Sequence, residues 1–141
     1  MTRRVPLELE RFLPYRLNVA AESVSRALSR IYGERYGIAI PEWRVIATLG
    51  QYRRMTAKAI GQHSRMHKTK VSRAIAELER LALIARAANK ADKREEFLTL
   101  TAKGERVYGE LAPAALGFEQ ALTAPLGRVL CRAARHQVAH R

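Results

Sequence analysis

Apolar residues recur at three- and four-residue steps through most of this chain, which predicts a mainly helical fold. The longest such segment spans residues 7–35, with apolar positions from Leu9 to Ile31. Pro14 falls inside it and either bends the first turns or marks a second start. A helix of this length exceeds what a small core needs. It either packs on a second copy of the chain or wraps around its own domain.

A shorter helix is predicted over residues 41–50. Pro41 suits its first helical position, and Gly50 suits its exit. The inward-facing residues of this helix would be Trp43, Ile46 and Leu49.

Residues 56–82 predict two helices joined by a tight turn at residues 64–66, which is a helix-turn-helix. Thr56 is the expected N-cap of the first helix. Small apolar contacts in that helix would come from Ala57, Ala59 and Ile60. The turn contains no glycine, and the second helix, at 67–82, has His67 at its N-cap position.

The helix at 67–82 has two faces of opposite character. One is an apolar stripe made of Val71, Ala74, Ile75, Leu78, Leu81 and Ala82. The other carries Lys68, Thr69, Ser72, Arg73 and Arg80. Arginine and lysine pair with guanine edges or phosphates, and hydroxyls contact either, so this face is suited to a DNA groove. The alternative is a solvated basic face on a structural helix.

After Leu83 the pattern changes to two short segments with some alternation, at residues 83–88 and 95–101. They predict a β-hairpin. Its loop, residues 89–94, places Lys90, Lys93 and Arg94 beside Asn89 and Asp92. A hairpin with a cationic tip after such a helix is a wing, and an arginine there suits the narrow minor groove. The alternative is an exposed, solvated turn.

Two more helices complete the pattern. Thr101 should cap the first, which Pro113 should kink and which should continue to about Leu122. The second is expected near residues 125–139. At 141 residues the chain is most simply one domain.

Charge is the outlier in the composition. The chain has 26 Lys+Arg against 13 Asp+Glu, a net charge of +13. Residues 51–106 hold 14 basic and 6 acidic residues, a net +8. A basic central segment implies a polyanionic partner, of which nucleic acid is the commonest. No apolar run is long enough to span a membrane, and the N-terminus lacks the apolar core of a signal peptide. With its single cysteine, Cys131, the chain is expected to be a soluble cytoplasmic protein.

The order of these parts resembles the MarR (multiple antibiotic resistance regulator) family of winged-helix transcriptional regulators. IPEWRVIATLG looks like the family's second helix, and KTKVSRAIAELERLALIAR like its recognition helix running into the first wing strand. The most specific part is DKREEFLTLTAKG, which matches the wing signature D-x-R…L-x-LT-x-x-G through Asp92, Arg94, Leu98, Leu100, Thr101 and Gly104.

The resemblance implies a homodimeric repressor on a pseudo-palindromic operator. Residues 1–36 and 105–141 would form a helical dimerisation region, and residues 41–104 the winged helix-turn-helix. Arg94 would enter the minor groove, and Asp92 would orient it or its neighbour through an ion pair. The candidate DNA contacts are Thr56, Lys68, Thr69, Lys70, Ser72, Arg73, Lys90, Asp92, Lys93 and Arg94. The ending from residue 122 is shorter and more basic than the usual family ending.

Family members usually release DNA when a ligand changes the distance between the two DNA-binding domains of the dimer. The candidate pocket residues here are Tyr15, Arg16, Asn18, Trp43 and Arg44. Their aromatic and cationic groups suit an aromatic carboxylate or an acyl-CoA thioester. The alternative is that Trp43 is simply part of the core.

Other chemistries have less support in the sequence. Arg128 and Arg135 would favour the thiolate of Cys131, but a buried or incidental cysteine fits better. The pairs His63/His67 and His136/His140 lack a third metal ligand, so no metal or other cofactor is expected. The carboxylate spacings and the absence of a phosphate loop or nucleophile motif argue against an enzyme. The remaining alternative is a sequence-neutral architectural DNA-binding protein using the same charge.

Overall fold

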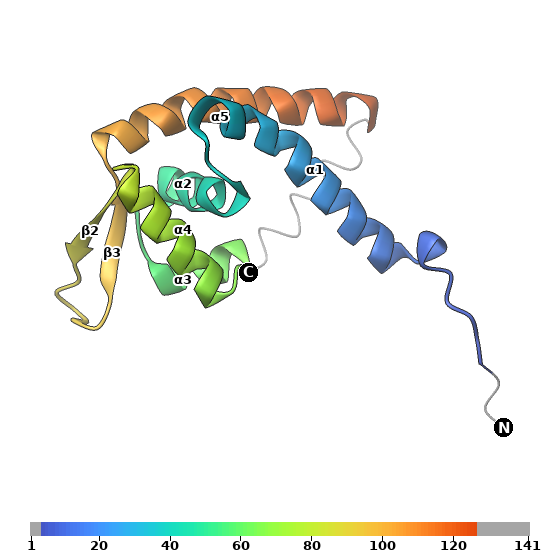
Figure 1. Ribbon diagram of the computed structural model, residues 1–141, viewed down its shortest axis with the longest axis horizontal. Helices are drawn as coiled ribbons and strands as arrows, with labels where there is room; N and C mark the ends of the chain where they lie inside the picture. The colour runs from blue at the N-terminus through green and yellow to red at the C-terminus, as the bar shows by residue number, and fades with distance from the viewer. Residues whose placement is uncertain (1–3, 127–141) are drawn as a thin grey trace.

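The computed structural model describes residues 4–126 and has a mainly helical architecture with one small antiparallel sheet, as predicted. In Figure 1 one long helix runs along the top and another descends obliquely from it toward the N-terminus, with the shorter helices and the hairpin beneath the first. The elements are η1 (Leu9–Arg11), α1 (Leu13–Tyr36), α2 (Ile40–Tyr52), β1 (Arg54–Thr56), α3 (Ala57–Ser64), α4 (Lys68–Arg80), β2 (Ile84–Ala88), β3 (Glu96–Leu100), α5 (Ala102–Thr123) and η2 (Ala124–Leu126).

Several sequence features lie outside the described residues. They are Cys131 with its neighbours Arg128 and Arg135, the pair His136/His140, and the predicted helix at 125–139 beyond its first two residues. In the described part of the chain, no helix combines the length and the apolar character that crossing a membrane requires.

Pro14 marks a start for α1. The segment predicted as one helix over 7–35 is a short 3-10 turn, η1, followed by α1, which has Pro14 in its first turn. Proline lacks a backbone N–H, which the first helical turn does not use, so it is tolerated there. The helix ends at Gly37, whose φ of 63° is the left-handed conformation that glycine adopts without strain.

The helix-turn-helix forms as predicted, with two local corrections. Ala57 is exposed, because the inward face of the short α3 is carried by Ile60 with Ala59 half-buried. Ala82 is also exposed and has a φ of 57°, because α4 ends at Arg80 and the chain reverses into β2. In the glycine-free turn, Arg65 takes the left-handed C-cap position with a φ of 57°.

The sheet has a third strand that the sequence pattern did not predict. Its order is β1-β3-β2, with Arg54 opposite Thr99 and Ile84 opposite Leu100. A strand of three residues is too short to show alternation, and β1 is defined by its pairing with β3 rather than by its own residues. It anchors the wing to the helix-turn-helix directly before α3.

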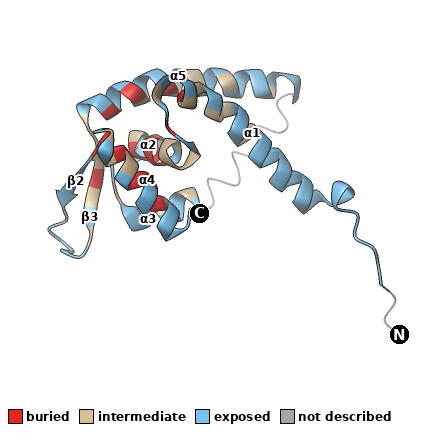
Figure 2. Cartoon of the chain, viewed as in Figure 1, coloured by how far each residue is buried: buried red, intermediate tan, exposed pale blue. Residues whose placement is uncertain are grey.

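The core lies where α2, α4 and β3 meet the C-terminal half of α1 and the N-terminal half of α5 (Figure 2). Ile46 and Leu49 are fully buried, as predicted, and so is Val45. Trp43, predicted to face inward, is only half-buried, and its ring stacks on the ring of Tyr32 with centroids 5.3 Å apart. That stack joins α1 to α2.

The outer halves of α1 and α5 leave their apolar residues uncovered in the single chain (Figure 2). Leu13, Leu17 and Leu116 are each about 60% exposed. Further exposed large apolar residues are Leu9 in η1, Phe12 directly before α1, Tyr15 and Val19 in α1, Leu122 in α5 and Leu126 in η2.

The start of α5 is fastened to the end of α4. Thr101 caps α5 by accepting a hydrogen bond from the Gly104 N–H at 3.0 Å, and its hydroxyl donates to the Ala82 carbonyl at 2.7 Å. The ammonium of Lys103 donates to the Leu81 carbonyl at 3.0 Å. Helix α5 continues through Pro113 to Thr123 without interruption.

Candidate nucleic-acid interface

The N-terminal half of α4 presents an exposed polar and cationic face. Val71, Ala74 and Ile75 are buried and fix the helix against α2 and α3. The other residues of this half of the helix up to Arg73 are all exposed, and they are Lys68, Thr69, Lys70, Ser72 and Arg73. The predicted orientation of this helix is therefore correct at each of these five candidate residues.

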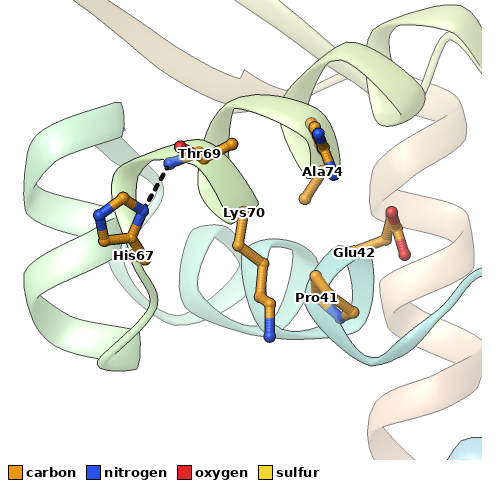
Figure 3. Close-up of a pocket in the computed structure, with 7 residues that line it drawn as sticks. Pro41, Glu42, His67, Thr69, Lys70 and Ala74 are labelled. Carbon is orange, nitrogen blue, oxygen red and sulfur yellow. Dashed lines mark hydrogen bonds between the residues drawn. The ribbon is translucent and has the colours of Figure 1, made fainter.

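His67 caps α4 through its ring rather than through an oxygen. Its Nδ1 accepts a hydrogen bond from the Thr69 backbone N–H at 3.3 Å (Figure 3). This contact satisfies one of the free N–H groups at the start of the helix, and it requires an unprotonated Nδ1.

A hollow of about 460 Å³ lies beside this cap, between the starts of α2 and α4 (Figure 3). Its lining consists of Pro41, Glu42, His67, Thr69, Lys70, Arg73 and Ala74. Because Lys70 and Arg73 also belong to the exposed face of α4, this hollow is part of the candidate interface.

The tip of the wing is held by two side chains of its own loop. The side-chain oxygen Oδ1 of Asn89 accepts from the backbone N–H groups of Ala91 and Asp92 at 3.0 and 3.2 Å. Asp92 in turn accepts from the backbone N–H of Arg94 at 3.0 Å and from its Nε at 3.2 Å. The hydrogen bond from the Arg94 side chain, followed by that from its backbone, holds the pKa of Asp92 below its usual value. The predicted pairing of Asp92 with Arg94 is therefore present.

Arg94 stays free to reach outward despite this pairing. Its side chain is 89% exposed. Lys90 and Lys93 are also exposed in the same loop. The wing thus presents three cations at its tip, one of them held in place by Asp92.

Thr56 has a capping role that restricts what else it can do. It is half-buried, and its hydroxyl oxygen accepts from the Ala59 N–H at 3.2 Å. Its hydroxyl proton is left for a second partner, so Thr56 is suited to donate to a phosphate. Lys58 and Arg65 are further exposed cations on α3 and in the turn, which the sequence reasoning did not single out. The lysine two residues after the N-cap threonine was the available signal.

Arg86 is a third residue that the sequence reasoning missed. It lies on β2 and forms ion pairs with Glu79 of α4 and Glu96 of β3. By contrast, the ion pair of Glu77 with Arg80 lies within α4 alone. Hydrogen bonding to Glu79, which is the largest cause, and to Glu96 raises the pKa of Arg86.

The five candidate ligand residues are not brought together within one chain. Tyr15, Arg16 and Asn18 are exposed on the first turns of α1, and Trp43 stacks on Tyr32 near the other end of that helix. At 1.5 Å per residue, Tyr15 and Tyr32 are about 25 Å apart along the axis of α1. Arg44 is exposed. A pocket using all five residues would need a second chain.

The remaining histidine of the turn region pairs with an aromatic residue. Nε2 of His63 lies 3.2 Å from the hydroxyl oxygen of Tyr52, and the two rings meet edge to face. With His67 engaged at its cap, the two histidines that lie four residues apart have separate partners.

Comparison with known proteins agrees with this geometry. The sequence profile of the MarR family matches residues 36–95. An uncharacterised HTH-type transcriptional regulator of Bacillus subtilis, YwoH, is 28% identical over 116 residues, which cover 82% of this chain and 83% of that protein.

Solved structures share the fold over nearly the whole chain. NadR in complex with 4-hydroxyphenylacetate has a TM-score of 0.79 at 22% identity, covering 99% of this chain and 96% of the other. A MarR/EmrR family regulator from Acinetobacter sp. ADP1 has a TM-score of 0.79 at 23% identity, covering 96% and 100%. Sco3205, a MarR family regulator from Streptomyces coelicolor in complex with DNA, has a TM-score of 0.78 at 19% identity, covering 99% and 89%.

Proposed function

Because this chain belongs to the MarR family of winged-helix DNA-binding transcriptional regulators, we propose that it binds a specific operator as a homodimer and acts as a repressor. Membership of a family of regulators agrees with the expectation that it is not an enzyme. One observation carries the proposal. The exposed cationic face of α4 stands beside a wing whose tip arginine is oriented by Asp92.

In this proposal α4 lies in the major groove. Lys68, Thr69, Lys70, Ser72 and Arg73 are the candidate contacts to base edges and phosphates. An arginine or lysine bonded to guanine contributes about 1–3 kcal/mol of discrimination against the wrong base. Thr56 would donate its hydroxyl proton to a phosphate, which positions the helix without reading sequence.

The wing would contact the neighbouring minor groove. Asp92 pre-orients Arg94, so less side-chain freedom is lost when the guanidinium enters the groove. Lys90 and Lys93 flank it and would contact the phosphates on either side. Arginine is favoured there, because a narrow minor groove concentrates negative potential.

The exposed apolar residues of α1 and α5 support a dimer. Leu13, Leu17 and Leu116 lie on helices whose other halves are packed, and exposed apolar residues that gather in this way mark interaction surfaces. A second copy covering them would hold two α4 helices apart, each reading half of a pseudo-palindromic site. Such half-sites would be separated by about one helical turn, ~10 base pairs.

A small aromatic acid or an acyl-CoA-type compound is the proposed inducer. NadR, which shares the fold, was solved with 4-hydroxyphenylacetate, an aromatic acid. The exposed Tyr15, Arg16 and Asn18 of one chain would complete a pocket with Trp43 and Arg44 of the other. To release DNA, the ligand must bind more tightly to the dimer conformation in which the spacing of the two DNA-binding domains does not match the spacing of the operator half-sites.

In vitro selection from a random duplex library tests the proposal. The protein should enrich one pseudo-palindromic sequence and bind it at least about 10³ times more tightly than random DNA at physiological salt. If the selected and random duplexes bind equally, with the same salt dependence, the protein is an architectural DNA binder instead. Mapping the enriched sequence onto the source genome would identify the regulated genes.

A further inference from the structure

Arg86 occupies a position between two carboxylates that belong to different elements. It lies on β2, and its Nε and Nη2 donate to Oε1 of Glu79 on α4 at 3.0 and 2.7 Å. Its Nη1 donates to Oε2 of Glu96 on β3 at 3.1 Å. One planar guanidinium therefore connects the helix proposed to read DNA with both strands of the wing.

These hydrogen bonds are suited to fixing an angle. The guanidinium presents its donors in a rigid fork, so two partners determine its plane as well as its position. Arg86 lies opposite Leu98, the buried middle residue of β3. Of the residues of β2, Ile84 is buried and those from Ala85 onward are exposed, so the outer wing gains little orientation from the core.

The distance from this contact to the wing tip makes small rotations matter. A strand advances about 3.3 Å per residue, so the end of β2 at Ala88 lies roughly 7 Å beyond Arg86. A rotation of about 10° would move that end by roughly 1 Å, and the loop carrying Arg94 by more. The hydrogen bonds that Arg94 would make to DNA have optimum lengths defined within a few tenths of an ångström.

We propose that Arg86 is a positioning residue that sets the angle of the wing to α4 and thereby places Arg94 in the minor groove. The proposal rests on the proposed DNA-binding function and extends it, since Arg86 acts through Arg94 and need not touch DNA itself. The ion pairs are partly exposed, so they contribute little to the stability of the fold. Their effect should appear in DNA binding instead.

A purely electrostatic role makes the opposite prediction for one variant. If Arg86 served only as a positive charge, the double substitution Glu79→Gln and Glu96→Gln would remove two negative charges and tighten DNA binding. If Arg86 positions the wing, the same double variant should lose contact at the minor groove, because neutral amides hold a guanidinium less strongly than carboxylates.

The experiment measures binding to the duplex selected by the wild-type protein. Arg86→Gln should weaken binding about three- to thirtyfold, and it should have less than about a twofold further effect when Arg94 is already alanine. Arg26→Gln is the matched control, because it removes an exposed ion pair confined to α1, and it should change binding less than about threefold.

Hydroxyl-radical footprinting supplies a readout that general misfolding would not reproduce. In Arg86→Gln, protection should be lost at the outer minor groove and retained around the major groove. Glu79→Gln alone, which leaves the Arg86–Glu96 pair, should show a weaker form of the same change. Thermal melting of each variant verifies that the fold is intact.

Three results would overturn the inference. They are unchanged binding by Arg86→Gln, a loss that adds fully to that of Arg94→Ala, and tighter binding with full wing protection in the double glutamine variant. A wild-type protein with no preference for the selected duplex would instead reject the proposed function itself. The two failures are thus distinguishable.

Discussion

Gly104 lies at a point where the backbone of α5 approaches the turn after α4 closely enough to exclude any side chain. A Cβ atom placed there would lie 2.0 Å from the carbonyl oxygen of Leu83 and 3.3 Å from the Cβ of Leu100. That carbonyl cannot move aside freely, because it accepts the Thr101 N–H at 3.0 Å. The substitution Gly104→Ala must therefore push the start of α5 away from α4 and β2.

The cost of Gly104→Ala follows from the contacts that such a movement disrupts. Overpacking of a tight contact costs about 1–3 kcal/mol. The hydrogen bonds from Thr101 to Ala82 and from Lys103 to Leu81 contribute about 0.5–1.5 kcal/mol each. Alanine in a helix gains about 1 kcal/mol over glycine. The net loss in free energy of unfolding should be about 3 kcal/mol.

Gly109 on the same helix provides the matched control. It is exposed, and a Cβ there meets no atom within 4 Å, so Gly109→Ala should gain about 0.5–1 kcal/mol from helix propensity. Urea unfolding followed by circular dichroism, at one fixed protein concentration, measures both changes. If the two variants shift the midpoint in the same direction, the close approach at Gly104 does not set the packing of α5.

Three further outcomes are expected. Arg94→Ala should weaken binding to the selected duplex by about 1–3 kcal/mol without changing the dimer. Arg26→Ala on α1 should leave DNA binding unchanged. If an anisotropy titration shows equal effects for both variants, the wing is not part of the interface. Leu17→Asp should raise the dimer dissociation constant at least about thirtyfold by burying an unpaired carboxylate, and Ser23→Asp should not; ultracentrifugation decides. Burial raises the pKa of Tyr32 to about 12, so it favours the neutral phenol. The contribution of the neutral phenol to the free energy of unfolding is complete below pH 10 and is lost as the pH rises toward 12. Between pH 10 and 12, the free energy of unfolding measured with urea should fall by about 1–2 kcal/mol less in Tyr32→Phe than in the wild-type protein. An identical fall in both proteins would contradict the assignment.

The helices and the hairpin could be predicted because their signals are local. In α4, the buried positions recur at helical spacing, so the exposed cations follow from the same periodicity. The pairing of Asp92 with Arg94 spans two residues of one loop and was also within reach of the sequence. Strand β1 was not, because three residues carry no period and their pairing with β3 joins segments more than forty residues apart.

Contacts between elements could not be predicted from either element alone. The Arg86 contacts join β2 to α4 across the turn at Leu81–Leu83, where Ala82 takes a positive φ, and the pattern of neither element alone indicates that its partner lies within reach. The sequence pattern placed Ala82 on the buried stripe by extending the helical period past the end of α4. The helical period of α2 placed Trp43 inward, whereas its indole is only half-buried and stacks on Tyr32.

The N-terminal half of α1 is where the sequence pattern and the single chain disagree. Its apolar residues follow the same helical spacing as those of α4, yet Leu13 and Leu17 are about 60% exposed. A single chain cannot remove this conflict by bending α1 back, because Tyr32 and Trp43 fix the other end of the helix against α2. Full burial of a leucine contributes about 1.5–3 kcal/mol, so covering these residues would add a large gain in stability. A second copy of the chain would realise that gain, and the proposed spacing of the two α4 helices would then be set by α1 and α5.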